Sequence, residues 1–309
     1  MFAARYLALR VAATVPVLLG VTLAVFVAMR LIPGDPAVIF AGDRATGEDI
    51  ARLRSELGLE RSLPVQYGIF LASLARGDLG VSIRTARPVA GELGARLGRT
   101  LELAVAAIAL TVAAGVPLGI ASAVRPQSAL DRAGLLVSLA GITAPAFVLG
   151  VLLQLVFAVR LGWLPTAGAG SPSHLLLPAL TLGAFPIANV ARLSRATMLD
   201  ALGEDFVRTA RAKGLAEAAV VWRHAWRAAL LPTVTVVGLQ FGYMLGGAVL
   251  VEMVFAWPGL GRFLVQAIAS RDYPAVQGTV LLLAAGYVLI NLIVDVLYAA
   301  LDPRIRHGA

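Results

Sequence analysis

Six stretches of the sequence run for about twenty residues or more with almost no charge. They are Val11–Met29, Leu103–Val124, Ala133–Val159, approximately Leu175–Ala191, Ala228–Val251 and Tyr273–Val294. A helix needs roughly 20 apolar residues to cross about 30 Å of hydrocarbon, so each stretch predicts one membrane-spanning helix. Pro145 falls inside the third stretch, and Pro178 and Pro186 interrupt the fourth, which is therefore the weakest. The predicted fold class is all-α, a polytopic membrane protein with six transmembrane helices.

Composition supports a membrane protein and excludes several other classes. Hydrophobic residues make up 59% of the 309 residues and charged residues 14%, against about 45–50% and 25% in an ordinary globular domain. Because a soluble chain could not bury this much apolar surface, a soluble enzyme, a disordered chain and a fibrous protein are excluded. The chain has no cysteine, which excludes disulfides and thiolate metal sites. The first apolar stretch is longer than the roughly 7–15 residues of a signal-peptide core, so we expect it to remain as a helix.

Basic residues are distributed unevenly between the loops. With the N-terminus inside, thirteen arginines and lysines fall in inner segments and three in the two short outer loops. This asymmetry predicts that both termini are cytoplasmic. The net charge of +8 is attributed to these loops and to anionic lipid, not to nucleic acid. Segment 32–100 carries nine arginines and eight acids, and we expect it to form a small extracytoplasmic subdomain with helices near Glu48–Leu57 and Pro64–Leu74.

The sequence carries few groups that could do chemistry. A phosphate-binding P-loop needs a lysine after a glycine-rich turn, and the one lysine, Lys213, stands in an Ala-Lys-Gly-Leu run instead. The three histidines are isolated, so we expect no metal site, and no catalytic or cofactor-binding motif is found. Asp295 lies inside the last apolar stretch, where an acid is a candidate functional group. A single acid makes a poor proton relay, so a packing role at the inner leaflet is favoured.

The inner segment 192–231 is too polar to span a membrane and too regular for a linker. Its run Gly203–Gly214 predicts a short helix with acids in the first turn and cations in the last, as the helix dipole favours. Gly214 suits the left-handed residue that ends a helix. The apolar face formed by Phe206, Val207 and Ala210 is either a docking surface for a partner or a face resting on lipid.

A second helix is predicted in the same segment, with Trp222 and Trp226 on one face and its end at Pro232. Glycines recur every four residues in two of the apolar stretches, at Gly115 and Gly119 and again at Gly238, Gly242 and Gly246. Small residues at this spacing let helix backbones approach closely, so helix packing is the favoured interpretation. The alternative is that the glycines of the fifth stretch flank a solute pathway.

Several short motifs together resemble one transporter family. The run Ala210–Gly214, followed by His224–Arg227 and Leu230–Pro232, resembles the cytoplasmic EAA loop of ABC importer permeases of the dipeptide, oligopeptide and nickel branch. Further motifs similar to that branch follow in the expected order at Ile32–Pro36, Gly77–Gly80, Leu161–Pro165, Val251–Gly261, Arg271–Pro274 and Leu301–Arg304. Arg208-Thr209-Ala210 replaces the Glu-Ala-Ala of the general pattern, as in the peptide branch. The long segment after the first helix resembles the B-type subunit of these systems.

The resemblance implies a protein of the bacterial inner membrane that works together with several other proteins. Two ATPase subunits would bind and hydrolyse ATP, an extracytoplasmic solute-binding protein would deliver the solute, and a second, related permease would pair with this chain in the lipid. The helix that docks on the ATPase would present Glu204, Asp205, Phe206, Val207, Ala210, Lys213 and Gly214. The chain would divide into a cytoplasmic N-terminus with the first span (1–31), the outer subdomain (32–100), a permease core (101–301) containing the coupling loop 192–231, and a cytoplasmic tail (302–309).

Import by alternating access is the implied activity, and short peptides are the favoured solute. Nickel chelates, glutathione or oligosaccharides carried by the same machinery are the close alternative. A self-contained secondary transporter would favour several intramembrane charges and an internal repeat, whereas the sequence offers one such acid and no clear repeat. An intramembrane enzyme would need a catalytic constellation that the sequence lacks.

Overall fold

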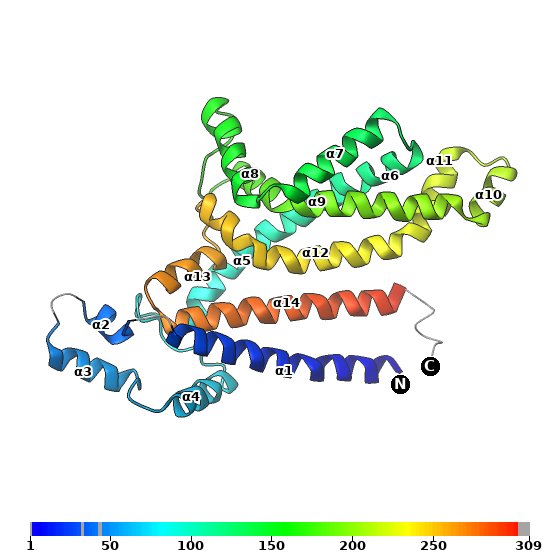
Figure 1. The fold of residues 1–309 in the computed structure, drawn as a ribbon. Helices are drawn as coiled ribbons and strands as arrows, with labels where there is room; N and C mark the ends of the chain where they lie inside the picture. The colour runs from blue at the N-terminus through cyan, green and yellow to red at the C-terminus, as the bar shows by residue number, and fades with distance from the viewer. Residues whose placement is uncertain (1, 32–33, 43–44, 302–309) are drawn as a thin grey trace. The chain divides into compact units, whose positions relative to one another are not determined.

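The structure is a computed structural model that describes residues 2–31, 34–42 and 45–301. These residues fold almost entirely into helices (Figure 1), and the β pairing among them is one antiparallel bridge between Val81 and Pro88. The all-α prediction is therefore confirmed. The tail 302–309 and residues 32 and 33 of the first motif lie outside the described residues.

The first half of the chain contains α1 (Phe2–Leu31), α2 (Pro36–Ala41), α3 (Gly47–Glu56), α4 (Leu63–Ala75), α5 (Val89–Leu110), the π-helical turn η1 (Thr111–Gly115), α6 (Val116–Val124), α7 (Ala129–Thr143), α8 (Ala146–Leu153) and the π-helical η2 (Gln154–Arg160). The second half contains α9 (Pro172–Gly203), α10 (Asp205–Ala212), α11 (Glu217–Ala219), the π-helical η3 (Val220–Ala225), α12 (Trp226–Val254), α13 (Leu260–Ala269) and α14 (Tyr273–Leu301).

Within the described residues, five helical stretches are long and apolar enough to cross a membrane, and a bent pair brings the number to six if it counts as one span. The first predicted span falls inside α1, and the second falls inside the continuous stretch that runs from α5 to α6. The fifth falls inside α12 and the last inside α14. Threonines inside these helices return their hydroxyls to the carbonyl four residues earlier, as Thr111 does to Ala107 and Thr279 to Ala275. Such bonds satisfy polar groups where no water is available.

The third predicted span, Ala133–Val159, is not one straight helix. α7 ends at Thr143, α8 begins at Ala146, and the two axes differ by 109°. Pro145 stands at the break with φ −60° and ψ 131°, outside the helical region. The proline ring disfavours helical backbone in the residue before it, so the helix ends there and restarts in a new direction.

The fourth predicted span, in contrast, is an unbroken helix that is longer than predicted. α9 runs without a break for 32 residues through Pro178 and Pro186, and it extends well beyond Ala191 to Gly203. Both prolines are buried, and α6, α7 and α12 pack along this helix. Packing neighbours hold a membrane helix together at proline positions that would end a helix in water. α12 also continues through Pro232, where the sequence predicted an end, although Pro232 is exposed.

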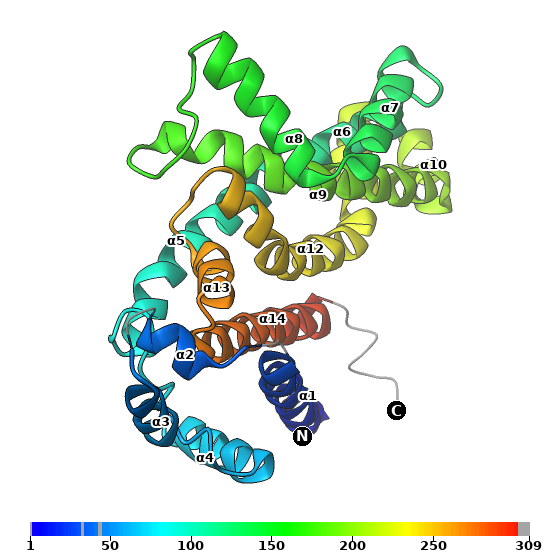
Figure 2. The same cartoon turned by 60° about the vertical axis from the view of Figure 1, so that its left-hand side comes forward.

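The chain divides into two compact units. The α9 unit comprises Met1–Ala8, Leu101–Trp257 and Tyr287–Ala309. In it α9 lies between α6 and α7 on one side and α12 on the other (Figure 2). One apolar cluster gathers around Leu103, Leu177, Met244 and Trp257, and a second gathers around Ile120, Met198, Val207 and Val220.

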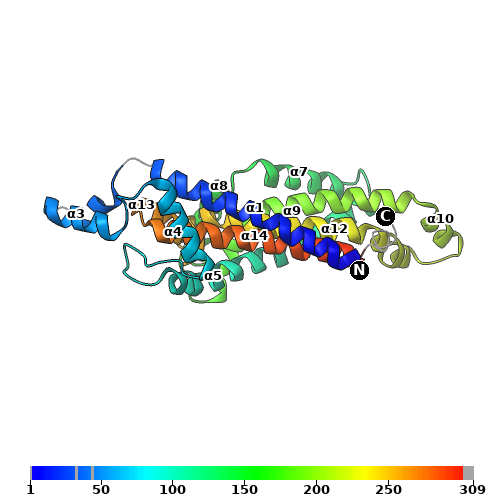
Figure 3. The same cartoon turned by 90° about the horizontal axis from the view of Figure 1, so that it is seen from below.

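The α13 unit comprises Leu9–Thr100 and Pro258–Gly286. Its apolar core includes Met29, Leu93, Leu260 and Phe263. α4 crosses the end of α1 (Figure 3), where the Tyr67 ring meets the Phe26 ring edge-on at a centroid distance of 5.1 Å. α3 and α4 match the two helices expected in the outer subdomain, and α3 starts at a reciprocal capping box between Thr46 and Asp49. The short helices α2 and α13 were not predicted from the sequence.

Candidate functional site

α10 is an eight-residue helix that directly follows the end of α9 (Figure 1). Glu204, with φ −73° and ψ 152°, separates the two helices without a side-chain cap. Asp205 lies in the first turn and Arg211 in the last, so the charges complement the helix dipole as the sequence predicted. Arg208 also pairs with Asp205 at 2.7 Å, but both side chains are exposed and the pair adds little stability.

Gly214 ends the turn after α10 with φ +76°, as the sequence predicted. Its N–H donates to the carbonyl of Arg211 at 2.9 Å, and the N–H of Leu215 donates to the carbonyl of Ala210. No atom lies within 4 Å of the place where a Cβ would be. The glycine is therefore required by the backbone conformation and not by lack of space. Lys213, at the helix C-cap, is exposed.

The apolar residues of α10 do not form the single docking face that the sequence suggested. Val207 is 0% exposed and Ala210 4%, and both pack in the cluster that contains Met198 and Val220. Phe206 points elsewhere and is 42% exposed. Val207 and Ala210 thus hold α10 against its own chain, and Phe206 is the large apolar side chain of α10 that remains accessible.

An ion pair closes the turn between α10 and α11. The Arg211 guanidinium donates to both carboxylate oxygens of Glu217, with Nη2–Oε1 at 2.6 Å and Nε–Oε2 at 3.1 Å. This hydrogen-bonded contact raises the pKa of Arg211. A bidentate contact also fixes the orientation of both groups. It bridges the turn around Gly214, although both side chains are exposed and the pair adds little stability.

The two tryptophans of this segment do not share one face. Trp222 is 54% exposed, whereas Trp226 packs against the cluster around Val207. Trp222 lies within η3 and Trp226 begins α12; the wider π-helical turn bonds each residue to one five positions away and so rotates the side chains that follow. η3 leads without a break into α12, so α10 is joined to a membrane-spanning helix through a π-helical turn.

The two glycine series make different contacts. A Cβ at Gly119 would lie 2.5 Å from the carbonyl oxygen of Ala191, and one at Gly115 would lie 2.9 Å from that of Ile187. These glycines therefore let the η1–α6 stretch pack backbone to backbone on α9. In the other series, Gly238 and Gly242 face side chains of α14. A Cβ added at Gly246 would have no atom within 4 Å.

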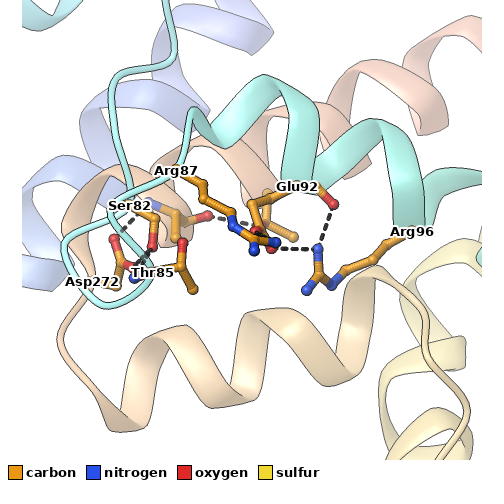
Figure 4. Close-up of polar contacts among 8 residues, drawn as sticks. Ser82, Thr85, Arg87, Glu92, Arg96 and Asp272 are labelled. Atoms are coloured by element: carbon orange, nitrogen blue, oxygen red, sulfur yellow. Dashed lines mark hydrogen bonds and ion pairs between the residues drawn. The ribbon is translucent and has the colours of Figure 1, made fainter.

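Three of the short motifs come together in the α13 unit. Asp272, 1% exposed, accepts hydrogen bonds from the Ser82 hydroxyl and from the backbone N–H groups of Ile83 and Arg84 (Figure 4). Gly80 packs against Pro274, and the Arg271 guanidinium lies against Gly34 so closely that a Cβ there would overlap it. Residues almost 200 positions apart in sequence thus fix one another.

Beside this contact, Glu92 is 8% exposed and pairs with Arg96 at 2.6 Å and with Arg87 at 3.9 Å (Figure 4). Since Arg87 and Arg96 approach Glu92 from two sides, its charge is compensated. Within the described residues no group of three or more acidic or histidine side chains could hold a metal ion.

Several helices that are long and apolar enough to cross a membrane, with a structured polar connection between two of them, define a multi-span membrane protein. Residues 115–307 match the family described as "Binding-protein-dependent transport system inner membrane component", and residues 3–104 match its N-terminal companion. The chain belongs to this family. It is a permease of a binding-protein-dependent ABC importer, of the type found in the dipeptide, oligopeptide and nickel branch, and it is a transport component, not an enzyme.

Several similar curated proteins are named "Glutathione transport system permease protein GsiC". The protein of Pectobacterium atrosepticum is 48% identical over 303 residues, which cover 98% of this chain and 99% of that protein. Those of Salmonella typhimurium and Escherichia coli K12 are 47% and 46% identical over the same coverage.

Solved structures share the fold. The inward-facing MetNI methionine ABC transporter matches with a TM-score of 0.58 at 19% identity, over 68% of this chain and 96% of that chain. An amino acid ABC transporter matches with a TM-score of 0.53 at 19% identity, over 70% and 94%. At this level of identity the likeness concerns the fold alone.

Sequence reasoning missed the polar contacts between distant segments. Arg195 on α9 makes a bidentate contact with Asp131 on α7, at 2.6 and 2.8 Å, and Asp131 is 2% exposed. No spacing rule joins residues that lie 64 positions apart. The available signal was an arginine shortly after the fourth predicted span and a lone acid shortly before the third.

Proposed function

We propose that this chain is the permease subunit of an importer for glutathione and closely related short peptides. The observation that carries this proposal is the 46–48% identity, over nearly the whole chain, to permeases named for glutathione transport. Glutathione is itself a tripeptide, so the proposal narrows the short-peptide prediction and does not replace it. Nickel chelates and oligosaccharides become the competing solutes.

The substrate is tested by uptake in cells that lack their own glutathione importer. The chain is expressed with its partner permease, ATPase subunits and binding protein, and uptake of radiolabelled glutathione is measured against unlabelled competitors. We expect glutathione to compete most strongly, with γ-linked dipeptides next. Uptake that responds to ordinary dipeptides, to a nickel chelate or to an oligosaccharide, and not to glutathione, would contradict the proposal.

We also infer that α10 transmits ATP hydrolysis to this permease by docking on an ATPase subunit. The support is the geometry of the connection, since α10 is anchored by buried Val207 and Ala210, closed by Gly214, and leaves Phe206 accessible. A partly exposed aromatic side chain on an otherwise anchored helix suits an interface anchor. Glu204, Asp205 and Lys213 would then form the polar surroundings of that anchor.

Phe206→Ala tests the docking role. Truncating an interface anchor commonly costs about 2 kcal/mol or more of binding, so we expect loss of the ATPase subunits or loss of substrate-stimulated ATP hydrolysis in the reconstituted complex. Folding should be unchanged because Phe206 is exposed, whereas Val207→Ala should lower thermal stability because it opens a cavity. Arg223→Ala, farther along the connection, serves as the surface control. If the complex with Phe206→Ala shows wild-type stimulation of ATP hydrolysis by substrate, α10 rests on lipid and does not dock on the ATPase.

The fifth-stretch glycines are assigned to helix packing. Gly238 and Gly242 set the spacing of α12 and the second half of α14, because Val294 and Tyr287 occupy the space beside them. Gly246 is left as the member of the series that faces away from the chain's own side chains and is available to a pathway or a partner.

A further inference from the structure

The α13 unit contains a cavity of about 370 Å³. It is lined by the end of α1, α4, the segment around Gly80 and the first turn of α14. Its volume lies within the range of roughly 300–1,000 Å³ that holds small-molecule ligands in proteins. The proposed topology places this part of the chain on the outer side of the membrane, where solute arrives.

Arg30 supplies an uncompensated positive charge to this cavity. Its guanidinium donates to Gln66 Oε1 from Nη2 at 2.7 Å and from Nε at 3.1 Å, and to the Phe26 carbonyl at 3.1 Å. It also lies over the Phe26 ring. Among the described residues, no carboxylate lies within ion-pair distance of Arg30. A guanidinium has five N–H donors, so donors remain for an anionic ligand.

Two further polar side chains line the cavity without a hydrogen-bond partner. Tyr273 is 9% exposed and Gln277 is 7% exposed, one helical turn apart at the start of α14. In the part of the chain that the structure describes, neither the Tyr273 hydroxyl nor the Gln277 amide makes a hydrogen bond. Neither group is among the buried polar atoms that lack a partner, so both keep surface open to the cavity and can hydrogen-bond to a ligand there.

The surrounding contacts hold these groups in place. Asp272 accepts the N–H of Ala275 at 3.2 Å as well as the bonds from residues 82–84, which fixes the first turn of α14 (Figure 4). Gln66 directs its oxygen to Arg30 because its Nε2 donates to the Arg61 carbonyl at 2.7 Å. The donors are thus positioned before a ligand binds, which lowers the entropic cost of binding.

The cavity is also lined by two carboxylates, Glu56 and Asp78. Glu56 pairs with exposed Arg52, and Asp78 accepts the Gly80 N–H at 2.8 Å, which leaves acceptor capacity on both groups. With Arg61 as a second arginine, the lining combines two cations, neutral donors and two acids, which is complementary to a molecule that carries both carboxylate and ammonium groups.

We propose that this cavity is a binding site for the carboxylate end of a zwitterionic short peptide, with Arg30, Tyr273 and Gln277 as its donors and with Glu56 and Asp78 on the side of the ammonium group. This inference rests on the proposed function, since it assigns a solute site to the same importer. The outer subdomain would then bind the solute during import.

The test measures binding of radiolabelled glutathione to the purified full-length permease with its partner subunits, in nanodiscs and without the binding protein. Arg30→Gln should weaken binding about tenfold or more, because a hydrogen bond to a charged group is lost. Tyr273→Phe and Gln277→Leu should each weaken it several-fold without disturbing the fold, and Arg30→Lys should restore part of the affinity. Glutathione amidated at its carboxyl groups should bind the wild type and Arg30→Gln equally weakly.

Arg76→Gln is the matched control, because Arg76 is an exposed arginine of the same unit whose side chain donates only to the Ala72 carbonyl. The inference is overturned if wild-type complex imports glutathione but all three cavity variants bind it normally. It is also overturned if the variants bind free glutathione normally yet lose stimulation by the loaded binding protein, which would make the cavity a docking site for an acidic side chain of that protein. Failure of the wild type to import glutathione would instead contradict the proposed function.

Discussion

Gly214 adopts a backbone conformation that β-branched residues resist, and the path of the chain from α10 into α11 depends on it. The position has ample room, so a substitution there is disfavoured by φ alone. The Arg211–Glu217 pair spans the same turn, which means that strain at Gly214 would also displace that contact. One residue thus controls both the direction of α10 and its link to α12.

We expect Gly214→Val to cost on the order of 1–3 kcal/mol locally and to abolish substrate-stimulated ATP hydrolysis while the chain still inserts in the membrane. Gly203→Ala is the matched control, since Gly203 also has open space around its Cβ position and ends a helix without a positive φ. The measurement is ATPase activity of the reconstituted complex with and without loaded binding protein. Equal stimulation in the two variants would show that the turn at Gly214 has no role in coupling.

At the scale of elements, α9 is the helix on which the others of its unit are assembled. α6 approaches it most closely because Gly115 and Gly119 present no side chain to its carbonyls. The Asp131–Arg195 contact then ties α7 to the same helix near its polar end. Steric fit and a charge-assisted contact together set the position of two neighbouring helices on α9.

Gly119→Ala is therefore expected to destabilise the chain strongly, because the new Cβ would meet backbone that cannot move aside cheaply. Overpacking of this kind commonly costs about 1–3 kcal/mol. Gly246→Ala is the comparison, since its Cβ position is open and the substitution should leave stability unchanged. Thermal unfolding in detergent measures both. Similar melting temperatures for the two variants would mean that α6 and α9 can separate without cost, contrary to the packing described.

The sequence could predict elements whose cause is local. Apolar runs of sufficient length located the spans, and the charge pattern with Gly214 located α10 within two residues at either end. It could not predict outcomes that depend on neighbours. Pro145 breaks a helix whereas Pro178, Pro186 and Pro232 do not, and the sequence around Pro178 and Pro186 does not reveal that packed helices bury them. Likewise, the sequence predicted the apolar face of α10. It could not predict that Val207 is buried and Phe206 accessible, because the segments that pack on α10 determine this.

At the scale of the whole molecule, the positive-inside asymmetry makes a prediction about which side of the membrane each segment occupies. Because the chain has no cysteine, single cysteines can be introduced without removing others. We expect exposed Ser62→Cys, between α3 and α4, to react with an impermeant thiol reagent in intact cells whose outer membrane has been made permeable. Ala216→Cys, beside α11, should react only after the inner membrane is opened. Labelling of Ala216→Cys in intact cells would reverse the proposed orientation.

The length of α9 has a mechanical consequence. Its 32 residues span about 48 Å at about 1.5 Å per residue, whereas the hydrocarbon core of a membrane is about 30 Å thick. With the span placed at Leu175–Ala191 as the sequence predicts, about 18 Å of helix would project beyond the hydrocarbon on the side of α10. Such a helix is a lever arm. A tilt of about 5° about its far end would displace α10 by about 4 Å. A small rearrangement among the spans would therefore become a movement of several ångströms at α10.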